Sequence, residues 1–171
     1  MRNASAVLYG PHDVRIEERT PPQPSAGQVL VEVAATGICG SDVHYYEHGR
    51  IGDYVVREPM VIGHESAGVI VEVGAGVDPG SRGELVALEP GVPCRHCQQC
   101  LRGRYNLCPR VVFFATPPVD GSITGYVAIN AGFAHPAPAG LTPEQAAMAE
   151  PVSVGVWAAR KCGVGGGPDA D

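Results

Sequence analysis

Residues 37–68 read GICGSDVHYYEHGRIGDYVVREPMVIGHESAG, and reactive side chains gather at the two ends of this stretch. At its start, a thiol, a hydroxyl, a carboxylate and an imidazole fall within six residues, at Cys39, Ser41, Asp42 and His44. The glycines around Cys39 break the preceding strand pattern, and we expect a short helix to open here and run through Tyr45. A lone cysteine is often a core residue and an aspartate often a helix cap, so spacing alone assigns neither to a metal.

At the other end of the stretch stand Gly63, His64 and Glu65. Neighbouring side chains on a strand point to opposite faces, so His64 and Glu65 reach one ion only where the chain bends. Gly63 permits such a bend, because glycine adopts backbone angles that other residues avoid. Two interpretations of His64 and Cys39 stay open: metal ligands, if the fold joins the two ends, or buried core residues.

A second group of reactive residues lies at 93–109, PCRHCQQCLRGRYNLCP, which contains Cys94, Cys97, Cys100 and Cys108. Two residues between successive cysteines let a loop place sulfurs around one ion. Four thiolates complete a tetrahedral shell and leave no open position, which predicts a structural zinc. Iron and no metal are the alternatives, and we interpret His96 as an exposed residue rather than a ligand.

Composition excludes several classes of protein. The 171 residues include 23 Gly and 16 Pro, too many for a helical bundle, while 44% hydrophobic residues argue against disorder. A zinc ribbon for nucleic acid is an alternative for the cysteines, but a net charge of −6 disfavours such a partner, and only four basic residues lie nearby: Arg95, Arg102, Arg104 and Arg110. The sequence shows no signal-peptide region and no apolar run of membrane-spanning length. We therefore expect a cytoplasmic protein with reduced thiols and no membrane partner.

Short strands separated by turn signals predict a mainly β fold. The third strand places Val29, Val31 and Val33 on one face. This pattern favours a partly open barrel or a sandwich. The expected strands cover residues 6–9, 14–17, 29–35, 68–74, 85–89 and 122–129.

Two short helices are expected toward the C-terminal end. Thr142 can cap the first helix, and Gln145 completes a capping box. We expect Pro151 to interrupt this helix, because proline removes a backbone donor and clashes with the preceding turn. A second helix is expected over 152–162, ending at Gly163.

Residues 37–68 closely resemble the zinc-dependent medium-chain alcohol dehydrogenase family, and within it the branch that acts on sorbitol and xylitol. The resemblance continues in the family's order through LVALEPGVPCRHCQQCLRGRYNLCP, FFATPPVDG, GYVAI and AEPVSVGVWAARKCGV. It extends over about residues 6–164. It implies a GroES-like, partly open β-barrel with a zinc lobe and short C-terminal helices, which makes residues 1–164 a catalytic domain and 165–171 a tail.

The resemblance implies a catalytic zinc in addition to the structural one. Cys39 and His64 match two of its ligands. The third ligand is implied to be Glu65 or Glu150, and we favour Glu65 as the direct ligand and Glu150 as one that acts through the metal's water. Asp42 is implied to orient His64 by accepting its other ring N–H.

Other residues are implied to serve the reaction. Ser41 and His44 match the family's relay, which carries the alcohol proton to solvent, and Tyr45 and Phe113 match the lining of its substrate pocket. Three protein ligands leave one coordination position open, where zinc lowers the pKa of an alcohol. The implied reaction oxidises a secondary alcohol of a small polyol to a ketone and passes hydride to NAD.

The resemblance also implies parts that this sequence does not show. Family members continue into a Rossmann domain, whose G-x-G-x-x-G motif follows a strand. The run GVGGGP at 163–168 fails at its last position, so we expect no cofactor-binding residues here and NAD binding only where a cofactor domain is supplied. Without that domain, Trp157 and residues 152–156 are expected to expose apolar surface.

Three functions stay open at this stage. The first is the catalytic half of a polyol dehydrogenase, inactive without its cofactor domain, which forms a homo-oligomer or joins a partner that supplies that domain. The second is a non-enzymatic zinc-binding GroES-like module. The third is a zinc ribbon for nucleic acid, which the acidic charge disfavours. The particular polyol and the choice between NAD and NADP are not decided by these residues.

Overall fold

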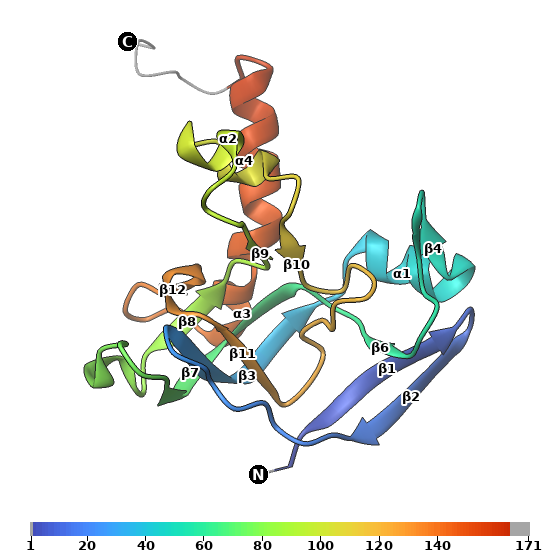
Figure 1. The fold of residues 1–171 in the computed structure, drawn as a ribbon, viewed down its shortest axis with the longest axis horizontal. Helices are drawn as coiled ribbons and strands as arrows, with labels where there is room; N and C mark the ends of the chain where they lie inside the picture. Colours follow the sequence, from blue (N-terminus) through green and yellow to red (C-terminus); the bar gives the residue numbers. More distant parts are fainter. Residues whose placement is uncertain (1, 165–171) are drawn as a thin grey trace.

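The computed structural model describes residues 2–164. Its centre is a five-stranded antiparallel sheet in the order β11-β3-β7-β8-β12. The sheet curls into a half-barrel (Figure 1), which confirms the predicted mainly β, partly open fold. Its strands are β3 (Gln28–Gly37), β7 (Glu65–Val73), β8 (Leu85–Leu88), β11 (Tyr126–Asn130) and β12 (Ala134–Pro136).

Three smaller sheets complete the β structure. A three-stranded sheet has the order β2-β1-β6, and two further pairs, β4-β5 and β10-β9, are short. Every strand pair within residues 2–164 is antiparallel. The strands are β1 (Ala4–Gly10), β2 (Asp13–Glu18), β4 (Arg50–Ile51), β5 (Tyr54–Val55), β6 (Met60–Val61), β9 (Gly91–Val92) and β10 (Val112–Phe113).

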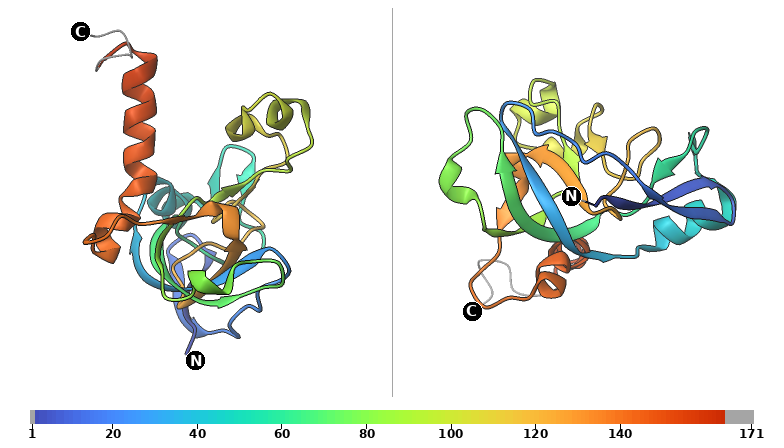
Figure 2. Two further views of the ribbon diagram at one scale, coloured as in Figure 1. Left: turned by 90° about the vertical axis from the view of Figure 1, so that its left-hand side faces the viewer. Right: turned by 90° about the horizontal axis from the view of Figure 1, so that it is seen from below.

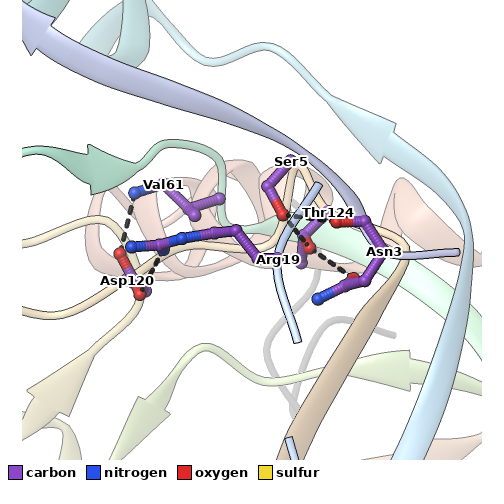
Figure 3. A network of polar contacts seen from close by, with 6 residues as sticks. All are labelled: Asn3, Ser5, Arg19, Val61, Asp120 and Thr124. Atoms are coloured by element: carbon purple, nitrogen blue, oxygen red, sulfur yellow. Dashed lines mark hydrogen bonds and ion pairs between the residues drawn. The ribbon is translucent and has the colours of Figure 1, made fainter. Parts of the chain in front are cut away.

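Polar contacts join the N-terminal hairpin to the segment before β11 (Figure 3). Thr124 Oγ1 donates to Asn3 Oδ1 at 2.8 Å. Asp120 accepts from the Val61 N–H at 2.8 Å and pairs with Arg19 at 2.8 Å. These bonds hold the smaller sheet against the half-barrel, since Asn3 precedes β1 and Val61 belongs to β6.

The interior contains two main apolar clusters. One fills the half-barrel and draws on every strand of the large sheet: Val29, Val31, Ile70, Val86, Leu88, Val127, Ile129, Phe133 and Ala134. The other lies between β1, β6 and the first helix: Ala6, Leu8, Tyr45, Met60, Ile62 and Ala115. Val29 and Val31 share the first cluster, as the alternation predicts, and Val33 packs against it.

The last predicted strand begins later than expected. It starts at Tyr126 rather than residue 122. The reason is that the preceding backbone bonds elsewhere: the Ile123 carbonyl accepts from the Ala6 N–H, and the Ile123 N–H donates to the Ile62 carbonyl, both at 2.9 Å. These bonds tie Ile123 to β1 and to Ile62, which follows β6, so the segment does not extend the β3 ladder.

Four α-helices and three short 3₁₀ turns are present among residues 2–164. The helix expected after Cys39 is α1, and the lobe that carries the cysteines contains α2. The 3₁₀ turns are Pro79–Ser81, Tyr105–Leu107 and Ala131–Phe133. The helices are α1 (Gly40–His48), α2 (Gln98–Leu101), α3 (Pro143–Ala147) and α4 (Ala149–Lys161).

The prediction that Pro151 interrupts the C-terminal helices is wrong. The predicted capping box of Thr142 and Gln145 is present, but α3 ends at Ala147 and α4 begins at Ala149. Pro151 therefore lies in the first turn of α4. The backbone N–H groups of a first turn have no partner within the helix, so proline costs little there.

α4 stands away from the half-barrel. Figure 2 shows it and the cysteine lobe as two separate projections from the same end of the molecule. No residue of α4 is buried, and the expected apolar exposure is confirmed at Val152, Val154, Val156 and Trp157. Among the described residues, no helix has the length and apolar character needed to cross a membrane. The tail at 165–171 and most of the run at 163–168 lie outside the described residues.

Close packing of β3 on β7 gives a stability prediction. A Cβ at Gly68 would collide with the backbone carbonyl of Glu32, whereas a Cβ at Gly155 in α4 would meet open space. We expect Gly68→Ala to lower the free energy of unfolding by about 2 kcal/mol or more. Gly155→Ala should raise it by up to about 1 kcal/mol, because alanine favours the helix. Urea titrations of both variants measure this, and equal stabilities would contradict the described packing.

Candidate metal centres

The structure brings together the two ends of the stretch 37–68. Cys39 Sγ, a ring nitrogen of His64 and a carboxylate oxygen of Glu65 all lie within 4.8 Å of one another. Cys39 caps α1 after β3, and Glu65 is the first residue of β7, paired with Gly37. His64 and Glu65 are 8% and 9% exposed, so both belong to the interior. A thiolate, an imidazole and a carboxylate are donors that zinc accepts in three-ligand sites.

Two glycines make this convergence possible. Gly63 has a φ of 92°, and a Cβ there would collide with Ile123, so the bend expected before His64 is present and needs glycine. Gly37 lies opposite Glu65 in the β3–β7 ladder. A Cβ on Gly37 would collide with the Glu65 carboxylate, so the missing side chain leaves that carboxylate its place beside Cys39.

Asp42 ties the two chain segments together. Its carboxylate is 2% exposed and accepts the Cys39 N–H and the Gly63 N–H, each at 2.9 Å. The first bond caps α1, and the second holds the turn before His64. Asp42 Oδ1 lies 3.9 Å from His64 Nδ1, which is longer than a hydrogen bond. Asp42 thus positions His64 through the backbone, and the direct ring contact stays a prediction.

A cavity of about 470 Å³ lies near His64, on the other side of Phe113, and Cys39, His64 and Glu65 are not among the residues that line it. Phe113 and Glu150 line it, and the Phe113 ring centroid lies 5.7 Å from that of His64. Partial burial raises the pKa of Glu150; His64 opposes this shift and the Glu65 carboxylate adds to it. Glu150 is therefore near the ligands but outside the group whose donor atoms converge, which supports Glu65 over Glu150 as the direct ligand.

The remaining candidates of the first stretch occupy different surroundings. Ser41 is half-buried in the first turn of α1, and His44 is exposed one turn further on. Tyr45 is 4% exposed and packs in the core cluster under α1, where burial raises its pKa. Of the two residues expected to line a substrate pocket, Phe113 faces the cavity and Tyr45 is mainly a core aromatic.

The four cysteines of the lobe form a second convergent group. The Sγ atom of Cys97 lies 3.4 Å from that of Cys100 and 3.9 Å from that of Cys108, and the Sγ atoms of Cys94 and Cys100 are 4.0 Å apart. Zn–S bonds of about 2.3 Å in a tetrahedron require sulfurs about 3.8 Å apart, so the arrangement fits zinc. His96 is exposed and its Nδ1 contacts the Cys94 carbonyl at 2.6 Å, away from the sulfurs.

Thiol acidity in the lobe is uneven. The backbone N–H of His96 is the main cause that lowers the pKa of Cys94 to about 6, while loss of solvent raises that of Cys100 to about 12. The N–H groups of Cys94 and Arg110 both point at Cys108 Sγ, at 3.4 Å. Backbone N–H groups aimed at sulfur stabilise thiolates, which are the form that binds zinc.

Sequence reasoning missed a polar cluster on the cavity wall. His135 Nε2 and Glu89 Oε2 are 2.8 Å apart, and both line the cavity with Tyr105. Burial raises the pKa of Tyr105, and Glu89 adds to this. No spacing could have revealed the cluster, because β12 pairs with β8 across some 45 intervening residues.

A curled antiparallel half-barrel with one closed and one open metal-ligand group describes a zinc-carrying domain of dehydrogenases, and comparison with known proteins agrees. Residues 25–139 match the model of the alcohol dehydrogenase GroES-like domain, so this chain belongs to that family.

Relatives over nearly the whole chain include two named polyol enzymes. D-xylulose reductase A of Aspergillus oryzae is 48% identical over 167 residues, 97% of this chain and 47% of that protein. Sorbitol dehydrogenase of Gallus gallus is 46% identical over 163 residues, 95% of this chain and 46% of that protein. A solved oxidoreductase of unknown specificity from Escherichia coli has a TM-score of 0.90 at 38% identity and covers 98% of this chain and 49% of its own. The chain thus spans about half the length of the relatives it matches.

The lobe gives a metal-content prediction. Cys108→Ser removes one of four thiolates, and we expect the purified variant to lose one zinc per chain and to unfold more readily, because a structural zinc contributes folding free energy. Cys162→Ser is the matched control, since Cys162 is exposed and outside both ligand groups. Elemental analysis measures the ratio. Unchanged zinc in Cys108→Ser would contradict the four-sulfur site.

The buried carboxylate of Asp42 gives a prediction of zinc affinity. Asp42→Asn replaces an acceptor oxygen with an NH₂ group facing a backbone N–H, so the positions of Cys39 and His64 should loosen. We expect zinc affinity at this centre to fall about 10–100-fold. Asp78→Asn is the control, because Asp78 caps the exposed turn Pro79–Ser81 with one bond that asparagine retains. Competition with a chelator measures affinity. Equal zinc retention by the two variants would show that Asp42 does not position the ligands.

Proposed function

We propose that this chain is the zinc-binding catalytic domain of a polyol dehydrogenase, which oxidises a secondary alcohol of a small sugar alcohol to a ketone with NAD. The observation that carries the proposal is the convergence of Cys39, His64 and Glu65, beside which Phe113 lies near His64 and also lines a cavity of about 470 Å³. Two relatives at 46–48% identity, named for D-xylulose reduction and sorbitol oxidation, support the substrate class.

The residues divide into holding and shaping roles. Cys39, His64 and Glu65 hold the catalytic zinc, which supplies a Lewis acid that lowers the pKa of an alcohol. Phe113 provides an apolar wall beside His64 and excludes water from that side. Glu150, half-buried and with a raised pKa, stands next to the ligands and accepts a hydrogen bond from water or a substrate hydroxyl.

The alcohol proton leaves along α1. Ser41 and His44 are three residues apart, so they share one face of the helix. Ser41 is half-buried beside Cys39 and His44 is exposed, so the pair leads from the ligand group to solvent. Tyr45 serves this arrangement by anchoring α1 in the core.

The nicotinamide is held by a unit outside the described residues. Dinucleotide-binding folds use parallel strands, and each strand pair of residues 2–164 is antiparallel. We therefore assign residues 1–164 to the catalytic domain and 165–171 to a connection. A cofactor domain, carried in the same polypeptide or by another subunit, completes the enzyme. The reduced four-cysteine lobe supports a cytoplasmic setting.

A fusion tests the proposal. Residues 1–164 joined to the C-terminal half of Aspergillus oryzae D-xylulose reductase A should produce NADH from NAD and xylitol or sorbitol. Cys39→Ala should lower kcat at least about 1000-fold, because the Lewis acid contributes several kcal/mol. Cys162→Ser should leave kcat unchanged. A fusion that holds two zinc ions and binds NAD, yet oxidises no polyol, would refute the proposed function.

A further inference from the structure

The outer face of α1 carries two histidines that the proposed chemistry only half explains. His44 and His48 are both exposed, and their rings lie face to face, 19° from parallel with centroids 4.4 Å apart. They are four residues apart in the helix, a spacing that puts side chains one above the other. The stacking of the two rings on each other does not explain why either histidine lies at the surface. The chain around them has a net charge of −6.

We propose that His44 and His48 form a third zinc site, an exposed one that inhibits the enzyme when it is occupied. Two histidines at i and i+4 on one helical face are an established zinc-ligand spacing. Because a Zn–N bond is about 2.0–2.1 Å, a tetrahedral ion bridges two nitrogens about 3.4 Å apart. The rings are stacked, so their in-plane lone pairs point side by side, and both exposed side chains must rotate for a nitrogen of each to face the same ion.

The surroundings leave the ring nitrogens available. Glu47 Oε2 lies 3.8 Å from His48 Nδ1, which leaves Nε2 of His48 for an ion. Carboxylate charge next to the pair adds to its attraction for a cation. Water completes the shell of such a two-ligand site, so binding is weaker than at the four cysteines, and the site responds to zinc in excess of that held by the other two centres.

The site is separate from the ligand group of Cys39. His44 follows Cys39 by five residues, which is about 7.5 Å along a helix axis. Neither His44 nor His48 belongs to the two groups of three or more convergent ligands found among residues 2–164. An ion on His44 nonetheless blocks the outer end of the Ser41–His44 path, because a coordinated nitrogen cannot accept a proton. This inhibitory effect, unlike the zinc site itself, rests on the proposed function.

Equilibrium dialysis of the full chain, already loaded with two zinc ions, tests the site without any activity. We expect a third equivalent of zinc to bind the wild type and to be lost in His48→Ala, with at least a tenfold rise in half-saturating zinc. His12→Asn is the matched control: His12 is an exposed histidine packed on Tyr46 of the same helix, and asparagine tolerates its φ of 61°. Saturation at two equivalents, or a third equivalent that survives His48→Ala, would overturn the site.

Inhibition is measured on the active fusion. Added zinc should lower the rate of NADH production by the wild type and His12→Asn, and His48→Ala should need at least tenfold more zinc for the same loss while keeping its basal rate. Equal inhibition of all three would overturn the inhibitory role, even where dialysis shows the third equivalent. A fusion without polyol oxidation would count against the proposed function alone, since the dialysis result stands apart from it.

Discussion

The carboxylate of Asp42 is the contact on which the open metal centre depends. It accepts backbone N–H groups from Cys39 and from Gly63, which belong to segments over 20 residues apart. A buried charge is costly unless it is fully hydrogen-bonded. Here two N–H groups and the N-terminus of α1 compensate it, and each charged hydrogen bond contributes about 1.5–3 kcal/mol. These two bonds thereby fix the Cys39 thiol and the His64 imidazole relative to each other.

Much of this arrangement could be predicted from sequence, for identifiable reasons. The spacing of Cys94, Cys97, Cys100 and Cys108 is local, so it specified the lobe's ligand group without knowledge of the fold. Gly63 signalled the bend before His64. The register of β3 on β7 is not local, and it alone brings Gly37 opposite Glu65 to make room for the carboxylate. Sequence spacing could not decide between Glu65 and Glu150 as the third ligand, and only the family resemblance favoured Glu65.

Other features depended on where helices break and which strands pair, and sequence patterns do not settle either. Pro151 was expected to end a helix, but a break at Met148 placed it in a first turn, where proline is accommodated. Glu89 and His135 meet only because β12 pairs with β8. Tyr105 from the cysteine lobe and Glu150 from α4 line the same cavity. The cysteine lobe therefore forms part of the wall of this cavity, together with the start of α4.

X-ray diffraction from zinc-loaded crystals, with anomalous data collected at the zinc edge, tests the central claim most directly. The account predicts one strong peak among the four sulfurs of the lobe. It predicts a second peak in contact with Cys39, His64 and Glu65, with Glu150 further from the ion. A second peak bound through Glu150 in place of Glu65 would reverse the ligand assignment. No peak between Cys39 and His64 would contradict the catalytic centre altogether.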